Sequence, residues 1–262
     1  MMGQALPAFS PAGYRTLLEQ LQAAGFALRP VEAMANPAAP VAYLRHDVDL
    51  HLRGIDEIAR IEAGLGAGAT YFVALTQPYN PALAGNRAVL TQLVALGHRI
   101  GLHYDLATYP RDHDAARAHL WQEIRSLQQL VEAPVASICM HNPWEAEPDL
   151  FAASVPDGLL NPHAPRFASV RYVSDSCRAW RDEALLDYLR DPEAGNLLLG
   201  THPELWLGSA QDDRLTFLHS TLMDAATADA RELLLDSVLP SWRRHPAARG
   251  HDERERVGGG RE

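Results

Sequence analysis

The sequence predicts an α/β protein in which a parallel β-sheet is covered by helices. Apolar runs rich in β-branched and aromatic residues, typical of buried strands, alternate along the chain with segments whose apolar residues recur at helical spacing. Strands that alternate with helices usually pair in parallel, because each helix carries the chain back to the start of the next strand. This pattern leaves two architectures open, an α/β barrel and an open doubly wound sheet.

The predicted elements follow one another from a first helix that begins after Ser10. Serine can cap this helix, Pro11 lies in its first turn and Gly25 ends it. Strands are predicted at residues 41–49, 69–75, 99–105, 134–140, 169–175 and 196–203. Helices are predicted at residues 55–66, 86–97, 112–132, 182–190 and 214–242, the last as a closing helical region. Residues 30–40 are predicted to be a loop, and proline-rich residues 145–168 a long excursion.

Length and composition predict one domain followed by a tail. The 262 residues, 47% of them hydrophobic, are enough for one large core. Neither an internal repeat nor a shift in composition marks a second domain, so we expect a single domain over residues 1–242. Residues 243–262 are charged and rich in glycine, and they are predicted to be disordered.

The charge and the cysteines of the chain limit its partners and its compartment. A formal net charge of −10 argues against a general nucleic-acid binder and against binding to anionic membranes, and it suits a small neutral substrate or a cation. Cys139 and Cys177 are too few for a disulfide framework and fit a reducing compartment. We find neither a signal peptide nor a membrane-spanning run, so we expect a cytoplasmic protein.

Side chains that can bind metals or move protons follow five of the predicted strands. They are His46, Asp47, Asp49, His103, Asp105, His141, Asp175, His202 and Glu204. The carboxyl ends of parallel strands meet at one face of the fold, where such proteins build their sites. We therefore expect these side chains to converge. A set that mixes carboxylates with imidazoles suits zinc or another first-row divalent ion better than calcium or magnesium.

Asp47 and Asp49 form the first part of this predicted site. Residues two apart on an extended chain point the same way, so both carboxylates can face one ion, or one can bind the ion while the other acts as a base. Carboxylates this close repel each other, which predicts a cation or a shared proton between them. The alternative is a solvated turn in which Asp49 caps the next helix.

Each of the other polar residues also has a structural explanation when it is taken alone. His103 could be a hydrogen-bonded core residue, and Asp175 could cap the next helix. Residues 141–144 and 201–204 both contain turn chemistry. His98, at the end of a predicted helix, is interpreted as structural. The common position of the remaining residues at strand ends favours a site.

The same residues resemble the ordered motifs of the polysaccharide deacetylases, the NodB-like carbohydrate esterases. The similar segments are residues 45–49, 97–103, 141–143, 175–180 and 201–206, within a region that extends from Val41 to Trp206. They look most like the branch associated with surface-polysaccharide and sugar biosynthesis. The resemblance implies a distorted, incomplete β/α barrel, which agrees with the alternation of strands and helices.

The resemblance also implies which residues hold the metal and which acts as the base. Asp47 matches the general base, Asp49 a metal ligand and His103 the first metal histidine. The family's two aspartates are adjacent, whereas Val48 separates them here, so the two roles could be exchanged or both aspartates could bind the metal. The family's second metal histidine comes four residues after the first, where this chain has Ala107.

Two residues are candidates for the missing metal ligand. The remaining motif residues match the general acid and the pair that orients it. His141 is the better replacement for the ligand, and Asp105 is the second candidate. His202 matches the general acid. Asp175, with Trp180 near it in the sequence, resembles the pair that orients and tunes this acid.

These matches predict a hydrolase that removes an N-acetyl group from a sugar or sugar conjugate, in polysaccharide or O-antigen biosynthesis. It would use one divalent transition metal, with zinc as the first candidate. The metal and Asp47 would activate water, and His202 would protonate the leaving amine. Further candidates for contact with the substrate are Arg45, Tyr104, Asn142, Trp144, Trp180, Glu204 and Trp206. Core packing is an equally good explanation for the aromatic ones.

Two other functions stay open. A non-catalytic relative that contains a metal and binds a sugar within a biosynthetic complex would explain Ala107. A metal hydrolase could also act on an ester or on a different C–N bond. Release of acetate from an acetamido sugar would separate these alternatives from the predicted activity.

Overall fold

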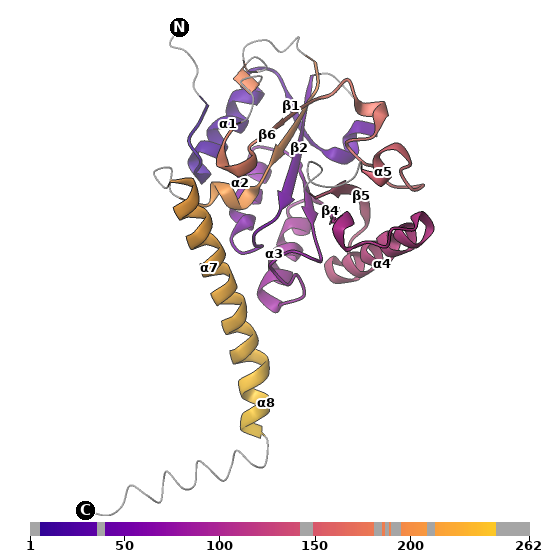
Figure 1. Cartoon of the computed structure of the whole chain (residues 1–262). Coiled ribbons are helices and arrows are strands. Elements are labelled where there is room, and N and C mark those ends of the chain that lie inside the picture. Colours follow the sequence, from indigo (N-terminus) through magenta and orange to yellow (C-terminus); the bar gives the residue numbers. More distant parts are fainter. Residues whose placement is uncertain are drawn as a thin grey trace, which may run out of the picture.

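The fold is built on a parallel β-sheet that is flanked by helices (Figure 1). The computed structural model describes residues 6–35, 40–141, 149–180, 185, 186, 189, 195–208 and 213–244. The strands are β1 (Ala27–Pro30), β2 (Val41–Val48), β3 (Thr70–Val73), β4 (Arg99–Tyr104), β5 (Val135–Met140), β6 (Arg171–Ser174) and β7 (Leu197–Thr201). Their order across the sheet is β5-β4-β3-β2-β7-β6, with β1 beside β2.

One edge of β2 is shared between two neighbouring strands, and the sheet does not close. The first half of β2 pairs with β1, from Ala27 opposite Val41 onward, and the second half pairs with β3, from Arg45 opposite Thr70 onward. In the described part of the chain, the terminal strands β5 and β6 do not pair with each other. The predicted α/β fold with an incomplete barrel is therefore confirmed.

The helices lie where the sequence predicts them, with short additions. The α-helices are α1 (Pro11–Ala23), α2 (Ile55–Gly64), α3 (Ala84–Ala95), α4 (His113–Val131), α5 (Leu150–Ala153), α7 (Arg214–Leu233) and α8 (Leu239–Arg244). The 3₁₀ turns are η1 (Val31–Ala35), η2 (Leu106–Thr108), η3 (Pro165–Phe167), η4 (Ser176–Arg178) and η6 (Pro203–Trp206). In the helix predicted at residues 182–190, the three described residues are helical. The side chain of Ser10 accepts from the backbone N–H of Gly13 at 3.0 Å, which confirms the predicted cap of α1.

The strand β1 is not among the predicted strands. It has four residues and ends at Pro30, and it continues directly into η1 inside the stretch that the sequence predicts as a loop. A strand this short offers no alternating pattern to detect. It lies beside the amino-terminal half of β2, so it supports the end of the barrel opposite the polar strand ends.

Side chains of β2 alternate between two environments. Ala42 and Leu44 point outward into the large core between sheet and helices, whereas Tyr43 belongs to a smaller cluster inside the barrel. His46 also points outward, where its Nε2 lies 2.5 Å from Glu62 of α2, and neither side chain is exposed. Asp47, one residue later, faces the inside. The period of two in an extended strand thus separates structural from site residues.

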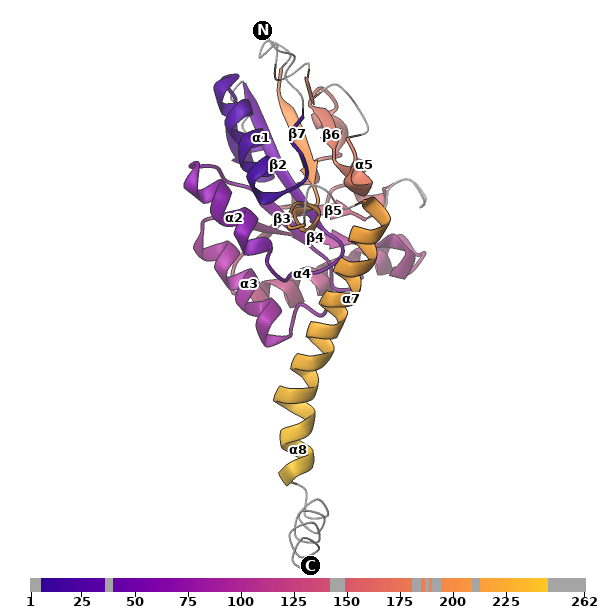
Figure 2. The ribbon, with the colours of Figure 1, turned by 90° about the vertical axis from the view of Figure 1, so that its left-hand side faces the viewer.

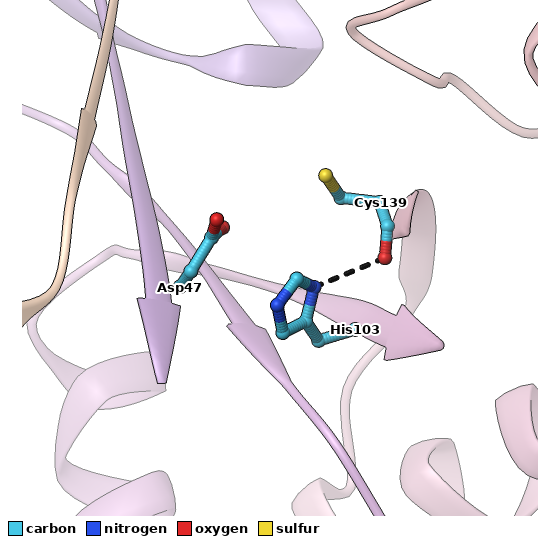
Figure 3. A group of neighbouring side chains, drawn as sticks. All are labelled: Asp47, His103 and Cys139. Atoms are coloured by element: carbon cyan, nitrogen blue, oxygen red, sulfur yellow. Dashed lines mark hydrogen bonds between the residues drawn. The ribbon is translucent and has the colours of Figure 1, made fainter. Parts of the chain in front are cut away.

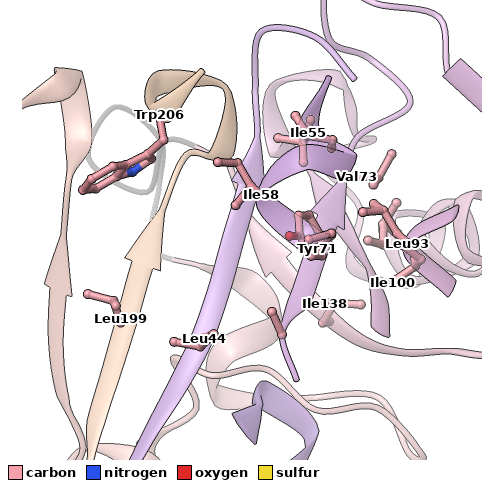
Figure 4. Close-up of a cluster of buried hydrophobic side chains, with 14 of the residues drawn as sticks. Leu44, Ile55, Ile58, Tyr71, Val73, Leu93, Ile100, Ile138, Leu199 and Trp206 are labelled. Atoms are coloured by element: carbon pink, nitrogen blue, oxygen red, sulfur yellow. The ribbon is translucent and has the colours of Figure 1, made fainter. Parts of the chain in front are cut away.

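The outer core is formed by apolar side chains from the strands and the covering helices (Figure 4). Leu44, Tyr71 and Ile100 of the sheet meet Ile58 of α2 and Leu93 of α3 in this core. All five are at most 2% exposed, so each contributes a stabilisation of about 1.5–3 kcal/mol relative to an exposed side chain. The core fixes the strands against the helices and so holds the strand ends in place.

The chain continues into a long helix that leaves the body of the protein (Figures 1 and 2). α7 passes through a π-helical turn, Leu234–Val238, into α8, and Phe217 is its one buried residue. Salt bridges of 2.7 Å join Arg53 to Asp229 and to Glu232 and hold α7 against the body. The closing region is helical as predicted, but little of its apolar surface is buried. No helix of the described segments has the length and apolarity needed to cross a membrane.

Candidate functional site

The candidate site is a pocket of about 240 Å³ at the carboxyl ends of the strands. It is lined by Arg45, Asp47, Asp49, His103, Met140, His141, Asp149, His163, Tyr172, Ser176 and His202. The structure therefore brings together polar residues at the carboxyl ends of β2, β4, β5 and β7, although Asp47 and His202, for example, are 155 residues apart in the sequence. Asp49 does not cap α2, whose N-cap residue is Gly54, so the alternative explanation for this aspartate is wrong.

Small inward-facing residues precede two of the histidines in the pocket. Gly101 lies two residues before His103 on β4, and Gly200 lies two residues before His202 after β7. A Cβ atom at Gly101 would overlap the ring of Phe72. Glycine therefore lets the strands pack closely inside the barrel, and the same alternation then turns each histidine toward the pocket.

Three possible ligand atoms form a triangle with equal sides. Oδ1 of Asp49 lies 3.3 Å from Nε2 of His103 and 3.3 Å from Nδ1 of His141. The two histidine nitrogens are also 3.3 Å apart. Zinc ligands at about 2.0–2.1 Å in a tetrahedral arrangement lie about 3.3–3.4 Å from one another. The triangle therefore has the dimensions of three zinc ligands.

Contacts around the triangle leave Nε2 of His103 and Oδ1 of Asp49 available to a cation. Nδ1 of His103 lies 3.0 Å from the backbone oxygen of Cys139 and donates to it, so Nε2 keeps its lone pair. Oδ1 of Asp49 is buried and accepts no hydrogen bond from the described residues. Burial by itself would raise the pKa of Asp49, but its three histidine neighbours hold that pKa well below its usual value. A buried, ionised oxygen of this kind fits a bound cation.

A second set of possible ligands shares His103 with the first (Figure 3). Ligand atoms of Asp47, His103 and Cys139 lie within 4.8 Å of one another. The hydrogen bond drawn in the figure runs from His103 to the carbonyl oxygen of Cys139 and not to its sulfur. Burial raises the pKa of the Cys139 thiol well above its usual value, and a neutral thiol is a poor metal ligand. The first set is therefore the better fit for a metal.

Asp47 is bonded to Arg45 through both of its oxygens. Nε of Arg45 donates to Oδ1 at 2.8 Å, and Nη2 donates to Oδ2 at 2.6 Å. Burial by itself would raise the pKa of Asp47, but the charge of Arg45 and smaller contributions from nearby histidines lower it. Asp47 is therefore an ionised carboxylate at the wall of the pocket, held in one orientation by a bidentate pair.

The remaining nitrogen of Arg45 contacts His163, which the sequence analysis did not identify. Nη1 of Arg45 lies 2.5 Å from Nε2 of His163. A guanidinium can only donate, so this nitrogen of His163 accepts and the imidazole is neutral. Burial and the charge of Arg45 lower the pKa of His163 to about 3. The ring of Tyr172, 5.3 Å from the guanidinium carbon, covers another side of Arg45.

His202 is held by Asp175 and faces Asp49. Its Nδ1 lies 2.7 Å from Oδ1 of Asp175, and its Nε2 lies 3.5 Å from Oδ2 of Asp49. Trp206 donates its indole N–H to the other oxygen of Asp175 at 2.7 Å. Burial by itself would lower the pKa of His202, but the hydrogen bonds with Asp175 and Asp49 raise it well above its usual value. Nε2 is therefore the protonated nitrogen that the pocket can use.

Glu204 bonds the backbone of the loop that carries Asp49, and it does not line the pocket. Its Oε1 accepts the backbone N–H groups of Asp49 and Leu50 at 2.7 and 2.8 Å. The side chain is completely buried, and Oε2 has no hydrogen-bond partner among the described residues. Burial, followed by the nearby charge of Asp49, raises the pKa of Glu204 to about 8.

Several residues predicted to contact substrate lie outside the lining of the pocket. The hydroxyl of Tyr104 donates to Asp149, and the ring is buried. Trp180 stacks on Phe9 with 6.1 Å between the ring centroids. The side chain of Asp105, the second candidate for the third metal ligand, instead accepts from a backbone N–H at the start of η2. Asn142 and Trp144 fall outside the described residues.

The pocket also contains residues that the sequence pattern could not identify. Asp149, His163 and Ser176 come from segments without regular periodicity, and Tyr172 lies within a predicted strand. The alternation of β6 was a usable signal for Tyr172, since Val173 belongs to the outer core and its neighbour Tyr172 therefore faces inward. His98, by contrast, is structural as predicted, because its ring is buried and bonds to the backbone at Ala59 and Ala69.

Comparison with known proteins gives matches among solved structures alone. No protein-family model and no curated protein matches the chain. The deacetylase PplD of Streptococcus pyogenes, solved with acetate, is 15% identical, with a TM-score of 0.42 over 83% of this chain and 89% of that one. The polysaccharide deacetylase BC0361 of Bacillus cereus is 13% identical, with a TM-score of 0.41 over 84% of this chain and 65% of that one.

Solved deacetylases are thus among the structures similar to this chain. The similar structures also include a protein described as a family 4 carbohydrate esterase pseudoenzyme, BA3943 of Bacillus anthracis. It is 16% identical, with a TM-score of 0.40 over 72% of this chain and 62% of that one. At these identities the similarity concerns the fold alone.

Proposed function

We propose that this chain is a metal-dependent hydrolase that removes the N-acetyl group from a sugar or sugar conjugate. The observation that carries the proposal is the 3.3 Å triangle of Asp49, His103 and His141, which adjoins the pair His202–Asp175 in one pocket. A zinc ion held by the triangle would supply a Lewis acid for an amide carbonyl and would make a water molecule more acidic.

Asp47 is the general base of the proposed reaction. It lines the pocket next to the triangle, and its lowered pKa keeps it ionised at neutral pH. An ionised carboxylate can take a proton from water as the water attacks the carbonyl carbon. Arg45 fixes the orientation of the carboxylate by its two hydrogen bonds, so little reorientation is needed.

His202 is the general acid. Asp175 occupies Nδ1, so Nε2 carries the proton that the leaving amine needs when the C–N bond breaks. The raised pKa keeps the imidazole protonated at neutral pH, which matches the demand of this step. Acetate and the free amino sugar are the products. Asp47 then releases its proton to solvent and His202 takes one up, which restores both groups.

The wider setting of the reaction is also part of the proposal. The acidic chain suits a neutral acetamido sugar better than a polyanion. We propose a role in the biosynthesis of a surface polysaccharide, such as an O-antigen, in the cytoplasm, with zinc as the native ion. These finer assignments rest on the resemblance described for the sequence and on the donor set of the triangle.

A non-catalytic sugar-binding role is the second candidate. The observation that favours it is the bond of both Asp47 oxygens to Arg45, because a carboxylate paired in this way is a weaker base. In that case the pocket would bind metal and sugar without turnover. The experiment below separates the two candidates.

The test is the release of acetate from N-acetylhexosamines, free and linked to a nucleoside diphosphate, and from N-acetylated oligosaccharides. Asp47→Asn and His202→Ala are expected to lower turnover by about a hundred- to ten-thousand-fold while zinc stays bound. Asp105→Asn, a carboxylate change just outside the pocket, is the control and is expected to keep normal turnover. A wild-type protein with full zinc that binds these sugars but releases no acetate would favour the non-catalytic role. Loss of zinc in Asp47→Asn would make Asp47 a ligand and Asp49 the candidate base.

A further inference from the structure

One short turn after β7 contacts the site through three alternate residues. This turn is His202–Trp206. His202 faces Asp49, Trp206 donates to Asp175, and Glu204 between them accepts from the backbone of the loop after β2. The first two contacts concern the proton donor. The contact of Glu204 concerns the loop that carries the predicted metal ligand.

The hydrogen bonds of Glu204 fix the backbone at Asp49. Oε1 of Glu204 is 2.7 Å from the amide nitrogen of Asp49 and 2.8 Å from that of Leu50. β2 ends at Val48, so these two N–H groups lie just beyond the last ladder pairing of the strand, Val48 opposite Val73. One carboxylate oxygen that accepts two consecutive N–H groups sets the direction in which the chain leaves the strand.

A carboxylate in this position is costly, which indicates that it has a purpose beyond packing. The side chain of Glu204 is 0% exposed, and Oε2 has no partner among the described residues. Burying a charged or unpaired polar group destabilises a fold unless something compensates for it. An apolar side chain of similar volume would avoid this penalty.

We propose that Glu204 is a positioning residue for the metal site, and that it holds the backbone of Asp49 so that Oδ1 occupies its corner of the triangle. The inference rests on the proposed function, because it assumes that Asp49, His103 and His141 bind a divalent metal. Without the acceptor, the two part-buried N–H groups must find other partners, and the loop has to shift. Even a displacement of about 1 Å would break the geometry that three ligands at about 2 Å require.

The test compares metal affinity with thermal stability in matched variants of the full chain. Glu204→Met removes the acceptor and keeps the volume, whereas Glu204→Gln keeps an oxygen that can accept both N–H groups. Glu204→Asp keeps a carboxyl group but is too short to reach them, and it serves where Glu204→Met does not fold. Glu32→Met is the control, because Glu32 bonds Thr70 of β3 and Ser137 of β5, and none of these three residues lines the pocket. Zinc affinity of metal-free protein is measured by competition with a chelating dye, and melting temperature by calorimetry.

Glu204→Met and Glu204→Asp are expected to bind zinc about ten- to a hundredfold more weakly than wild type, the usual cost of losing a group that orients a ligand. Glu204→Gln is expected to lose much less, and Glu32→Met is expected to lower the melting temperature without changing the affinity for zinc. Folded Glu204→Met or Glu204→Asp with wild-type zinc affinity would overturn the inference and leave the proposed function intact. Failure of the wild type itself to bind zinc would overturn both.

Discussion

Nδ1 of His202 lies 2.7 Å from Oδ1 of Asp175, and this contact decides which nitrogen of His202 faces the pocket. It also raises the pKa of His202, together with the contact to Asp49 and against the effect of burial. A general acid with a raised pKa loses activity when the pH rises through that pKa. Asp175→Asn is therefore expected to move the alkaline limb of the pH–rate profile to lower pH.

The measurement for this prediction is kcat/KM for acetate release as a function of pH. The zinc content of the protein is checked at the lowest and at the highest pH. His202 should lose its proton more easily in Asp175→Asn, so the variant should be most impaired at alkaline pH and least impaired at acidic pH. An alkaline limb that stays at the wild-type position would contradict the role given to Asp175.

Trp206 and Trp180 allow a matched test of the hydrogen bond that orients Asp175. The indole N–H of Trp206 donates to Oδ2 of Asp175 at 2.7 Å, whereas that of Trp180 has no hydrogen-bond partner among the described residues. A hydrogen bond to a charged group contributes about 1.5–3 kcal/mol, and its loss should cost turnover about tenfold. Trp206→Phe is expected to show this loss in kcat, and Trp180→Phe is expected to remain close to wild type. Equal losses in both variants would indicate a packing effect and not the orientation of Asp175.

His163 gives the protein a predicted sensitivity to acid. Burial and the charge of Arg45 lower its pKa to about 3, whereas an unfolded histidine titrates near pH 6.5. Between these two values the unfolded chain binds more protons, so stability is lost as the pH falls from about 6.5 toward 3. His163→Asn removes this titration, and its melting temperature should fall less than that of the wild type between pH 7 and pH 5. His219→Asn, at an exposed position on α7, is the control. Parallel acid curves for wild type and His163→Asn would refute the prediction.

The parts of the fold and site that the sequence predicts are those with local signals. Alternation in β2 places Asp47 and Asp49 at the pocket, whereas His46, which the sequence was expected to bring into the same site, points the other way and bonds Glu62 of α2. Position at a strand end identified His103 and His141, and it did so because parallel strands all end at the same face. These signals depend on a few neighbouring residues, so they are readable without a structure.

Contacts between distant segments were not predictable. Glu204 bonds a backbone 155 residues away, and nothing in its local sequence indicates that contact. His163 reaches Arg45 from a proline-rich segment without periodicity, so its place in the pocket depends on how the whole segment folds back onto β5. The helix α7 has an amphipathic sequence, but whether its apolar face packs on the body depends on the surface available there.

The metal triangle is tested most directly by the metal content of protein purified without chelators. Elemental analysis is expected to find one divalent ion per chain in the wild type and in Asp105→Asn, whose side chain bonds a turn and lies outside the triangle. His103→Ala and His141→Ala each remove one corner and are expected to bind the ion at least about a hundredfold more weakly. A wild type without a divalent ion, or a His141→Ala variant that keeps a full and equally tight complement, would contradict the metal site formed by Asp49, His103 and His141.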